Sequence, residues 1–186
     1  MNVYDFDKTI YKKDSSVQFY LYAIKGHPLV FVRSIFCQIC GIIQYKLGRI
    51  SKERMKEKYF VFFKYIDAEK LADDFVEKDF KNINSWYVDK KRPDDVIISA
   101  SPEFIVKRFM RKMGVNNVIA SDVSPADGKF TGANCHGKEK LRRFELNYGD
   151  CRIDEFYSDS YSDLPLAQKA ERAFLVKKDG FAEFDK

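Results

Sequence analysis

The feature that most constrains the fold is a single strand-like segment separated from the other strands by a long helical block. Residues 2–6 include the apolar or aromatic side chains of Val3, Tyr4 and Phe6 and predict a short buried strand. Residues 14–91 show helical patterning throughout, and strands alternate with helices only after Pro93. Such alternation is typical of a parallel sheet with helices on both faces. We therefore expect an α/β fold, a Rossmann-like parallel sheet into which an α-helical bundle is inserted.

Turn and capping residues place the expected elements. In the block, helices should follow the polar or proline residues Asp14, Pro28, Ser51 and Asp67, the third running to about Lys64, with a short fifth helix afterwards. Later strands are expected at 95–99, 118–121, 154–158 and 173–177, and a hairpin at 126–132. Helices are expected from Ser101-Pro102 to Met113, at 138–147 and at 163–171, with Ser101 as a helix cap. Residues 1–13 and 92–186 form the predicted core, and residues 14–91 the predicted cap.

Composition narrows the class of protein. A chain of 186 residues that is 45% hydrophobic can bury one sizeable core, and it is too apolar to be disordered. Its formal charge of +5 fits an anionic ligand, but no pattern of aromatic and basic residues suggests RNA, so nucleic acid is not expected. Four cysteines are too few for a disulfide framework. With acidic residues starting at once, we expect no signal peptide and a cytoplasmic protein.

The most apolar segment is 28–45, which contains one charge, Arg33. A membrane span needs about 20 predominantly apolar residues, and this run is short and interrupted by Gln38 and Gln44. We predict a buried helix of the inserted bundle. The alternative is a helix that faces a membrane or grips a lipid, which would make the protein membrane-peripheral.

Two aspartates close the first strand. Side chains alternate along a strand, so Asp5 and Asp7 point to the same side, at the strand end where open α/β folds bind ligands. Adjacent carboxylates repel unless a cation lies between them or one is protonated. Mg²⁺ binds through one or two carboxylates together with phosphate oxygens. The pair therefore suggests phosphoryl chemistry, in which one aspartate attacks and its neighbour transfers protons.

Residues at later strand ends support this interpretation. Ser99 ends the second strand, and its hydroxyl with the following backbone N–H groups could hold a phosphate. The basic helix at 138–143 can supply a cation. Asp159 is placed to bind the metal, and Asp163 to hold the lysine or a metal-bound water.

These motifs, in this order, resemble the phosphatases of the haloacid dehalogenase (HAD) superfamily. The stretch Asp5-Phe6-Asp7-Lys8-Thr9 is similar to the first family motif, DxDxT; Ser99, a lysine, and the Asp159 and Asp163 pair supply the rest. The helical insertion resembles the cap of the phosphoserine phosphatase-like branch. The stretches SASPEF, CHGKEKLRR and YSDSYSDLPL look most similar to bacterial members of the phosphatidylglycerophosphatase type.

The resemblance implies roles for these residues. Asp5 would be the nucleophile and Asp7 the general acid and base. Mg²⁺ would be held by Asp5, the Asp7 carbonyl and Asp159. The implied phosphate-binding residues are Ser99, Ala100, Thr9 and a lysine, for which the pattern C-x-G-x-x-K selects Lys140 and the pattern K-G-x-hydrophobic selects Lys138. We favour Lys140.

Two departures bear on the substrate. The second motif of phosphoserine phosphatases is Ser-Gly-Gly, but here it is Ser99-Ala100-Ser101, and a family glutamate that recognises the substrate amino group is replaced by Asp14. We therefore expect a Mg²⁺-dependent phosphomonoester hydrolase acting through an aspartyl-phosphate on a small phosphorylated metabolite other than phosphoserine. The alternatives are a phosphatase for a lipid-linked phosphate ester and a non-catalytic phosphate-binding module.

Overall fold

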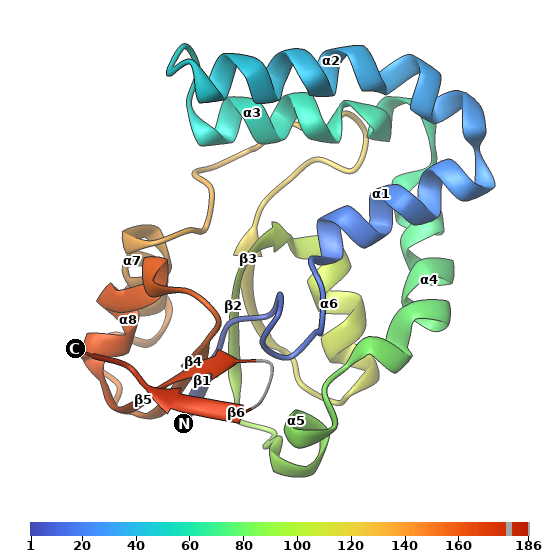
Figure 1. The fold of residues 1–186 in the computed structure, drawn as a ribbon. Coiled ribbons are helices and arrows are strands. Elements are labelled where there is room, and N and C mark those ends of the chain that lie inside the picture. The colour runs from blue at the N-terminus through green and yellow to red at the C-terminus, as the bar shows by residue number, and fades with distance from the viewer. Residues whose placement is uncertain (178–179, 186) are drawn as a thin grey trace.

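The computed structural model describes residues 1–177 and 180–185. A six-stranded sheet has the order β3-β2-β1-β4-β5-β6, and every neighbouring pair is parallel except β5 and β6. Figure 1 shows the sheet with helices around it and α2 above, with α3 beneath α2. The strands are Asn2–Tyr4 (β1), Val96–Pro102 (β2), Asn117–Ser121 (β3), Ile153–Ser158 (β4), Ala170–Lys177 (β5) and Gly180–Glu183 (β6). The predicted α/β fold is confirmed.

The first strand lies in the middle of the sheet. Val3 pairs with Val96 on one side and with Phe156 on the other, and all three residues of β1 are buried. Strands buried on both faces are near-continuously apolar, as here. Asp5 follows at once, and its N–H still donates to the Tyr157 carbonyl at 2.8 Å. The strand therefore delivers Asp5 to the centre of the carboxyl edge.

Side-chain caps begin three of the α-helices in the described residues. The α-helices are Ser15–Gly26 (α1), Pro28–Lys46 (α2), Lys52–Tyr59 (α3), Ala68–Asp79 (α4), Ser85–Lys90 (α5), Glu103–Lys112 (α6), Lys138–Tyr148 (α7) and Leu164–Lys169 (α8). Short 3₁₀ turns span Phe60–Tyr65 (η1), Phe80–Asn82 (η2) and Tyr161–Asp163 (η3). The side chains of Asp14, Ser51 and Asp67 accept from backbone N–H groups of the first turns of α1, α3 and α4, which the sequence predicted for these cap residues.

Several predicted boundaries are wrong. The third helix ends at Tyr59 rather than near Lys64, because the tighter turn of η1 stacks Phe60 on Phe63, with ring centroids 5.3 Å apart. The helix predicted at 163–171 ends at Lys169, since Ala170 already pairs with Ile153 in the sheet. The hairpin predicted at 126–132 is present as a short antiparallel turn that begins earlier, with Val123 bridging Phe130 and the Ser124 N–H donating to the Lys129 carbonyl at 2.8 Å.

Ser101 does not cap a helix. Strand β2 continues to Pro102, and Pro102 precedes α6 without a side-chain capping bond. The Ser101 side chain is buried and turns to the carboxyl edge of the sheet instead. The prediction failed because a serine before a proline is compatible both with a helix cap and with one of the last residues of a strand.

The prediction of a buried helix at 28–45 is also wrong. The buried residues of α2 are Val30, Ser34, Gln38 and Gly41, and Phe36 is 77% exposed. In the described part of the chain, α2 is the one helix whose length and composition would suit a membrane span, a test that core helices also pass.

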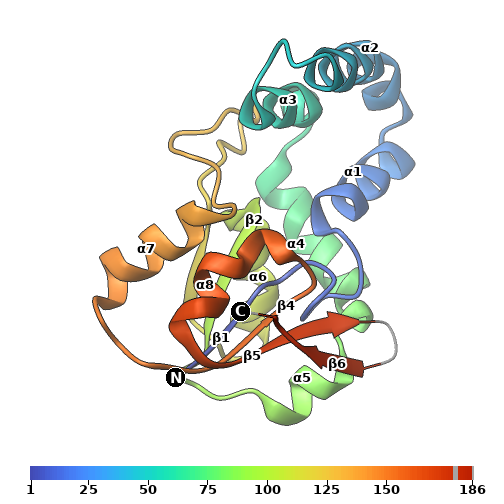
Figure 2. The same cartoon turned by 60° about the vertical axis from the view of Figure 1, so that its left-hand side comes forward.

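The cap elements differ in how closely they join the core. α4 packs against α6, and Tyr87 of α5 meets Tyr4 of β1 edge-on at 4.9 Å between ring centroids. α2 and α3 instead pack on each other and stand away from the sheet (Figure 2). The boundary at residue 91 stays a prediction.

Candidate active site

The acidic residues gather in a pocket at the carboxyl edge of β1, β2 and β4. The pocket has a volume of about 270 Å³. It is roofed by α3 and by the segment before α7, which contribute Lys52, Lys56 and His136. Its other charged lining residues are Asp5, Asp7, Lys8, Asp14, Lys140, Asp159 and Asp163. The geometry brings together carboxylates and cations from segments far apart in sequence.

Lys140 is the centre of a buried ionic triad. Its Nζ donates to Asp5 Oδ1 and to Asp163 Oδ2, each at 2.6 Å, and Asp163 also accepts from the Ser158 hydroxyl at 2.8 Å. All three ionic side chains are less than a tenth exposed. Buried charges need such pairing because leaving water is costly. Lys138, the alternative lysine, is exposed and does not line the pocket, so the structure brings Lys140 to the carboxylates.

The protonation of this triad follows from its burial. Removal from water raises the pKa of Asp5 to about 7, with Lys140 opposing the shift and the charge of Asp163 adding to it. Burial alone would lower the pKa of Lys140, but the attraction of Asp5 and Asp163 raises it. Lys140 is therefore a permanent cation, and a further positive charge in the pocket would favour the ionised Asp5.

Asp7 is fixed by two donors from different segments. It accepts the Ser15 N–H at 2.7 Å and a short hydrogen bond from the Ser101 hydroxyl. Burial and the nearby charge of Asp14 raise the pKa of Asp7 to about 6. A carboxyl with a pKa near neutrality can both give and take a proton. Sequence reasoning missed Ser101, although Ser99 and Ser101 share one side of a continuing strand.

The chain turns sharply between the two aspartates and α1. Lys8 has a φ of 56°, in the left-handed region that non-glycine residues rarely adopt. Its N–H donates to the Lys13 carbonyl at 3.1 Å, which closes the loop. Such strain concentrates at functional sites, and here it brings the α1 N-terminus back to Asp7.

The predicted phosphate-binding residues lie at different distances from the pocket. Ala100 lines it, whereas Ser99 lies behind it, buried, with its hydroxyl accepting the Ser101 N–H at 3.1 Å. Thr9 does not line the pocket. Its side chain is buried, and its hydroxyl has no hydrogen-bond partner among residues 1–177 and 180–185. Asp14 lines the pocket but also caps α1 through the Val17 N–H at 3.0 Å.

Three basic side chains over the pocket were not predicted. Lys56 of α3 donates to the Ala100 carbonyl at 2.8 Å and to Asn134 Oδ1 at 3.0 Å. Lys52 Nζ lies 2.7 Å from His136 Nε2. The only available signal was the spacing of Lys52 and Lys56, which places them on one face of a helix. What they face depends on the tertiary fold.

Burial and mutual repulsion perturb these groups. The pKa of Lys56 falls to about 8, chiefly through desolvation and then through the charge of Lys52. Desolvation also lowers the pKa of Lys52, and desolvation followed by the Lys52 charge lowers that of His136. A neutral His136 imidazole can accept a hydrogen bond from the Lys52 ammonium through Nε2. An anion bound among these groups would relieve their repulsion.

The pocket fits Mg²⁺ by the chemistry of its donors. Asp5 and Asp159 supply carboxylate oxygens, and burial raises the pKa of Asp159 while Lys8 and Lys140 oppose the shift. Within the described residues, no cluster of three or more His, Cys, Asp and Glu side chains is arranged to hold a metal. Mg²⁺ does not need one, because it keeps water and substrate phosphate oxygens in its shell.

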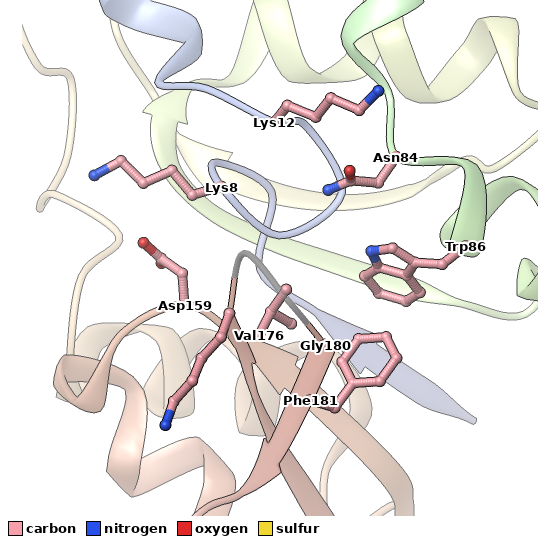
Figure 3. A pocket seen from close by; sticks show the side chains of 9 residues that line it. Lys8, Lys12, Asn84, Trp86, Asp159, Val176, Gly180 and Phe181 are labelled. Atoms are coloured by element: carbon pink, nitrogen blue, oxygen red, sulfur yellow. The ribbon is translucent and has the colours of Figure 1, made fainter.

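A larger hollow of about 620 Å³ adjoins the pocket and shares Lys8 and Asp159 with it. Figure 3 shows Lys8 and Asp159 at one end and Trp86 and Phe181 at the other. The two aromatic rings meet edge-on, with centroids 5.0 Å apart. Among the described residues that line this hollow, Asp159 is the one carboxylate. Asp5 and Asp7 line the smaller pocket instead.

Comparison with known proteins identifies the family of this chain. The family described as haloacid dehalogenase-like hydrolase matches residues 3–168, a range that includes Asp5, Asp7, Lys140 and Asp163. The chain belongs to this family. The predicted closeness to phosphatidylglycerophosphatase-type members has no counterpart among these similarities.

The relatives of this hydrolase are distant. A probable phosphatase of Mycobacterium tuberculosis is 33% identical over 96 residues, which cover 46% of this chain and 32% of that protein. The chain thus spans about a third of the length of the curated relatives it matches. A solved structure of unknown function from Bordetella pertussis has a TM-score of 0.74 at 20% identity, covering 93% of this chain and 87% of the other. A phosphoserine phosphohydrolase-like protein from Francisella tularensis has a TM-score of 0.57 at 18% identity, covering 93% and 86%. These two likenesses show the fold.

Proposed function

We propose that this protein is a Mg²⁺-dependent phosphomonoester hydrolase that works through an aspartyl-phosphate intermediate. One observation carries the proposal. Asp5 is paired with the buried cation Lys140, while Asp7 is held beside it by Ser101 and Ser15. This gives one carboxylate the environment of a nucleophile and the other that of a proton carrier.

The residues divide the reaction between them. A carboxylate oxygen of Asp5 attacks phosphorus as the bond to the leaving oxygen breaks, and protonated Asp7 gives that oxygen its proton. Asp7 then takes a proton from the water that hydrolyses the acyl phosphate. Lys140 and the Ala100 N–H, which line the pocket, hold the phosphoryl oxygens, while Ser99 behind them fixes the Ser101 backbone. Bound by Asp5, Asp159 and the Asp7 carbonyl, Mg²⁺ would neutralise phosphate charge.

The roof of the pocket suggests the class of substrate. Lys52, Lys56 and His136 suit a phosphomonoester that carries a second anionic group, such as a carboxylate or another phosphate. Asp14 adds one carboxylate and could contact a hydroxyl or amine of the leaving group. A small phosphorylated metabolite in the cytoplasm meets these conditions. A lipid-linked phosphate is the second candidate, favoured by the exposed apolar side chains of α2.

The direct test is hydrolysis of p-nitrophenyl phosphate with Mg²⁺ and with EDTA. We expect turnover that requires Mg²⁺ and falls by at least about a thousandfold in Asp5→Asn, because the nucleophile is lost. Asp150→Asn, which alters a fully exposed carboxylate, should keep wild-type activity. Full activity of Asp5→Asn would exclude Asp5 as the nucleophile. If neither protein hydrolyses this ester, orthophosphate binding with Mg²⁺ distinguishes a selective cap from a site without catalysis.

A further inference from the structure

Helix α2 is apolar on its outside. Leu29, Val32, Phe36, Ile39, Ile43 and Leu47 recur at spacings of three and four residues and so share one face of the helix. Their exposed fractions range from 48% for Ile39 to 77% for Phe36. We call these six residues the α2 stripe. A surface helix normally turns such a stripe toward the core, and this one does the reverse.

The opposite face fixes α2 in this orientation. Gln38 Nε2 donates to the Tyr59 carbonyl of α3 at 3.0 Å, and the Ser34 hydroxyl lies 3.5 Å from the Tyr20 hydroxyl of α1. At Gly41 the α3 side chain of Lys58 comes so close that a Cβ would lie 2.8 Å from the Lys58 Cβ. Rotating α2 to bury the stripe would break these contacts and overlap α3. The stripe must therefore be covered from outside the chain.

The positive charge around the α2 stripe indicates which kind of surface covers the stripe. No Asp or Glu occurs between Asp14 and Glu53, and residues 25–64 contain nine Lys or Arg and two Glu. That segment thus has a formal charge of +7, more than the +5 of the whole chain. Lys25, Arg33, Lys46 and Arg49 are exposed near the two ends of the helix. A second copy of this face would bring like charges together, whereas an anionic surface would neutralise them.

We propose that the α2 stripe docks on a lipid bilayer that contains anionic headgroups, with the helix lying in the plane of the interface. Apolar side chains enter the acyl boundary while flanking Lys and Arg contact headgroups. Figure 1 shows α2 outermost, with α3 between it and the sheet, so the stripe can reach a flat surface. The polar contacts to α3 oppose a spanning orientation. This attachment does not depend on the proposed phosphatase activity.

Vesicle co-sedimentation of the full chain tests the inference. We expect binding to vesicles of phosphatidylcholine mixed with phosphatidylglycerol and little binding to phosphatidylcholine alone. The double variant Val32→Glu/Phe36→Glu should lose at least tenfold in partitioning. Leu146→Glu is the matched control, because Leu146 is 69% exposed on α7, outside the cap. Its binding should equal that of the wild type.

A second pair of substitutions separates charge from apolar contact. Arg33→Gln/Arg49→Gln should weaken partitioning roughly 30-fold, because each basic residue near an anionic surface contributes about 1 kcal/mol. Hydrolysis of a soluble ester should be unchanged in all these variants, which also shows that they fold. Equal binding of wild type and Val32→Glu/Phe36→Glu, or no binding at all, overturns the proposal. A dimer that Phe36→Glu dissociates would assign the stripe to a second copy and overturn it as well.

Discussion

At the scale of single residues, the site depends on how charges are paired. Lys140 bonds to two carboxylates, and its removal would leave both Asp5 and Asp163 buried without a cation. Lys56 has a different environment, because it donates to the neutral oxygens of Ala100 and Asn134. Lys140 therefore stays charged at any moderate pH, while the charge on Lys56 responds to pH.

The pH dependence of substrate binding should report on Lys56. Its pKa is lowered to about 8 by desolvation and by Lys52 and Lys140, against attraction from Asp7 and Asp14. As pH rises through about 8 the proton is lost, so kcat/KM for an ester with a second anionic group should fall by about tenfold per pH unit. Initial rates between pH 6 and pH 10 (roughly the range that brackets both protonation states) measure this. Lys56→Arg should remove the part of the decline that is centred near pH 8, because arginine stays charged.

The same shift has a consequence for folding. Between the folded pKa of about 8 and the ordinary lysine value of 10.5, the unfolded chain binds more protons than the native chain at this position. The Lys56 contribution to the free energy of unfolding should therefore increase with pH in that window.

For the activity measurement, a decline of kcat/KM near pH 8 that persists in Lys56→Arg would assign the titration to a group other than Lys56.

At the scale of elements, the cap and the core meet through tight backbone contacts. Gly128 lies in the turn after β3 with a φ of +74°, and its N–H donates to the Ser124 carbonyl at 2.8 Å. A Cβ there would overlap the Phe60 carbonyl and lie 2.6 Å from the Phe60 Cβ. Gly128 thus allows this core loop to approach η1 of the cap.

Gly128→Ala should destabilise the protein by about 2–4 kcal/mol, from the unfavourable φ and the overlap together. Urea unfolding followed by circular dichroism measures the change. Gly149→Ala is a matched control, since Gly149 has a φ of +59° and no heavy atom within 4 Å of a Cβ; it should cost about 1 kcal/mol. If both variants lose the same free energy of unfolding, the positive φ of Gly128 alone requires a glycine there, and the contact with Phe60 does not.

Local features of the sequence predicted the elements that local physics determines. The caps at Asp14, Ser51 and Asp67 bond within their own first turns, so no distant residue is needed to predict them. The two aspartates and Ser99 were found because strand ends share one edge of a parallel sheet. Ser101 was missed because its bond to Asp7 joins β2 to the loop after β1. The exposure of α2 was missed because a sequence that is apolar on several sides of a helix does not show which face packs against the protein.

At the scale of the whole molecule, the pocket joins two bodies of structure. Lys56 reaches from α3 to the Ala100 carbonyl, and Lys52 reaches His136 before α7. The contacts of these two lysines are to neutral acceptors, so within the described residues the roof of the pocket carries positive charge without a carboxylate bonded to it. A bound phosphate would pair with this charge and connect α3 to the core. Ligand binding and global stability should therefore be coupled.

Orthophosphate with Mg²⁺ should raise the melting temperature of the chain. A ligand at 100 times its dissociation constant stabilises the native state by about 2.7 kcal/mol, which for a chain of this size corresponds to roughly 5–10 °C. Differential scanning calorimetry with phosphate, Mg²⁺, both and neither measures the effect, and EDTA should reverse the Mg²⁺-dependent part. In Lys56→Ala the phosphate shift should shrink, because the link from α3 is lost. Asp150→Asn should behave as the wild type. An undiminished shift in Lys56→Ala would mean that phosphate binds to the core alone and that the roof of the pocket serves the rest of the substrate.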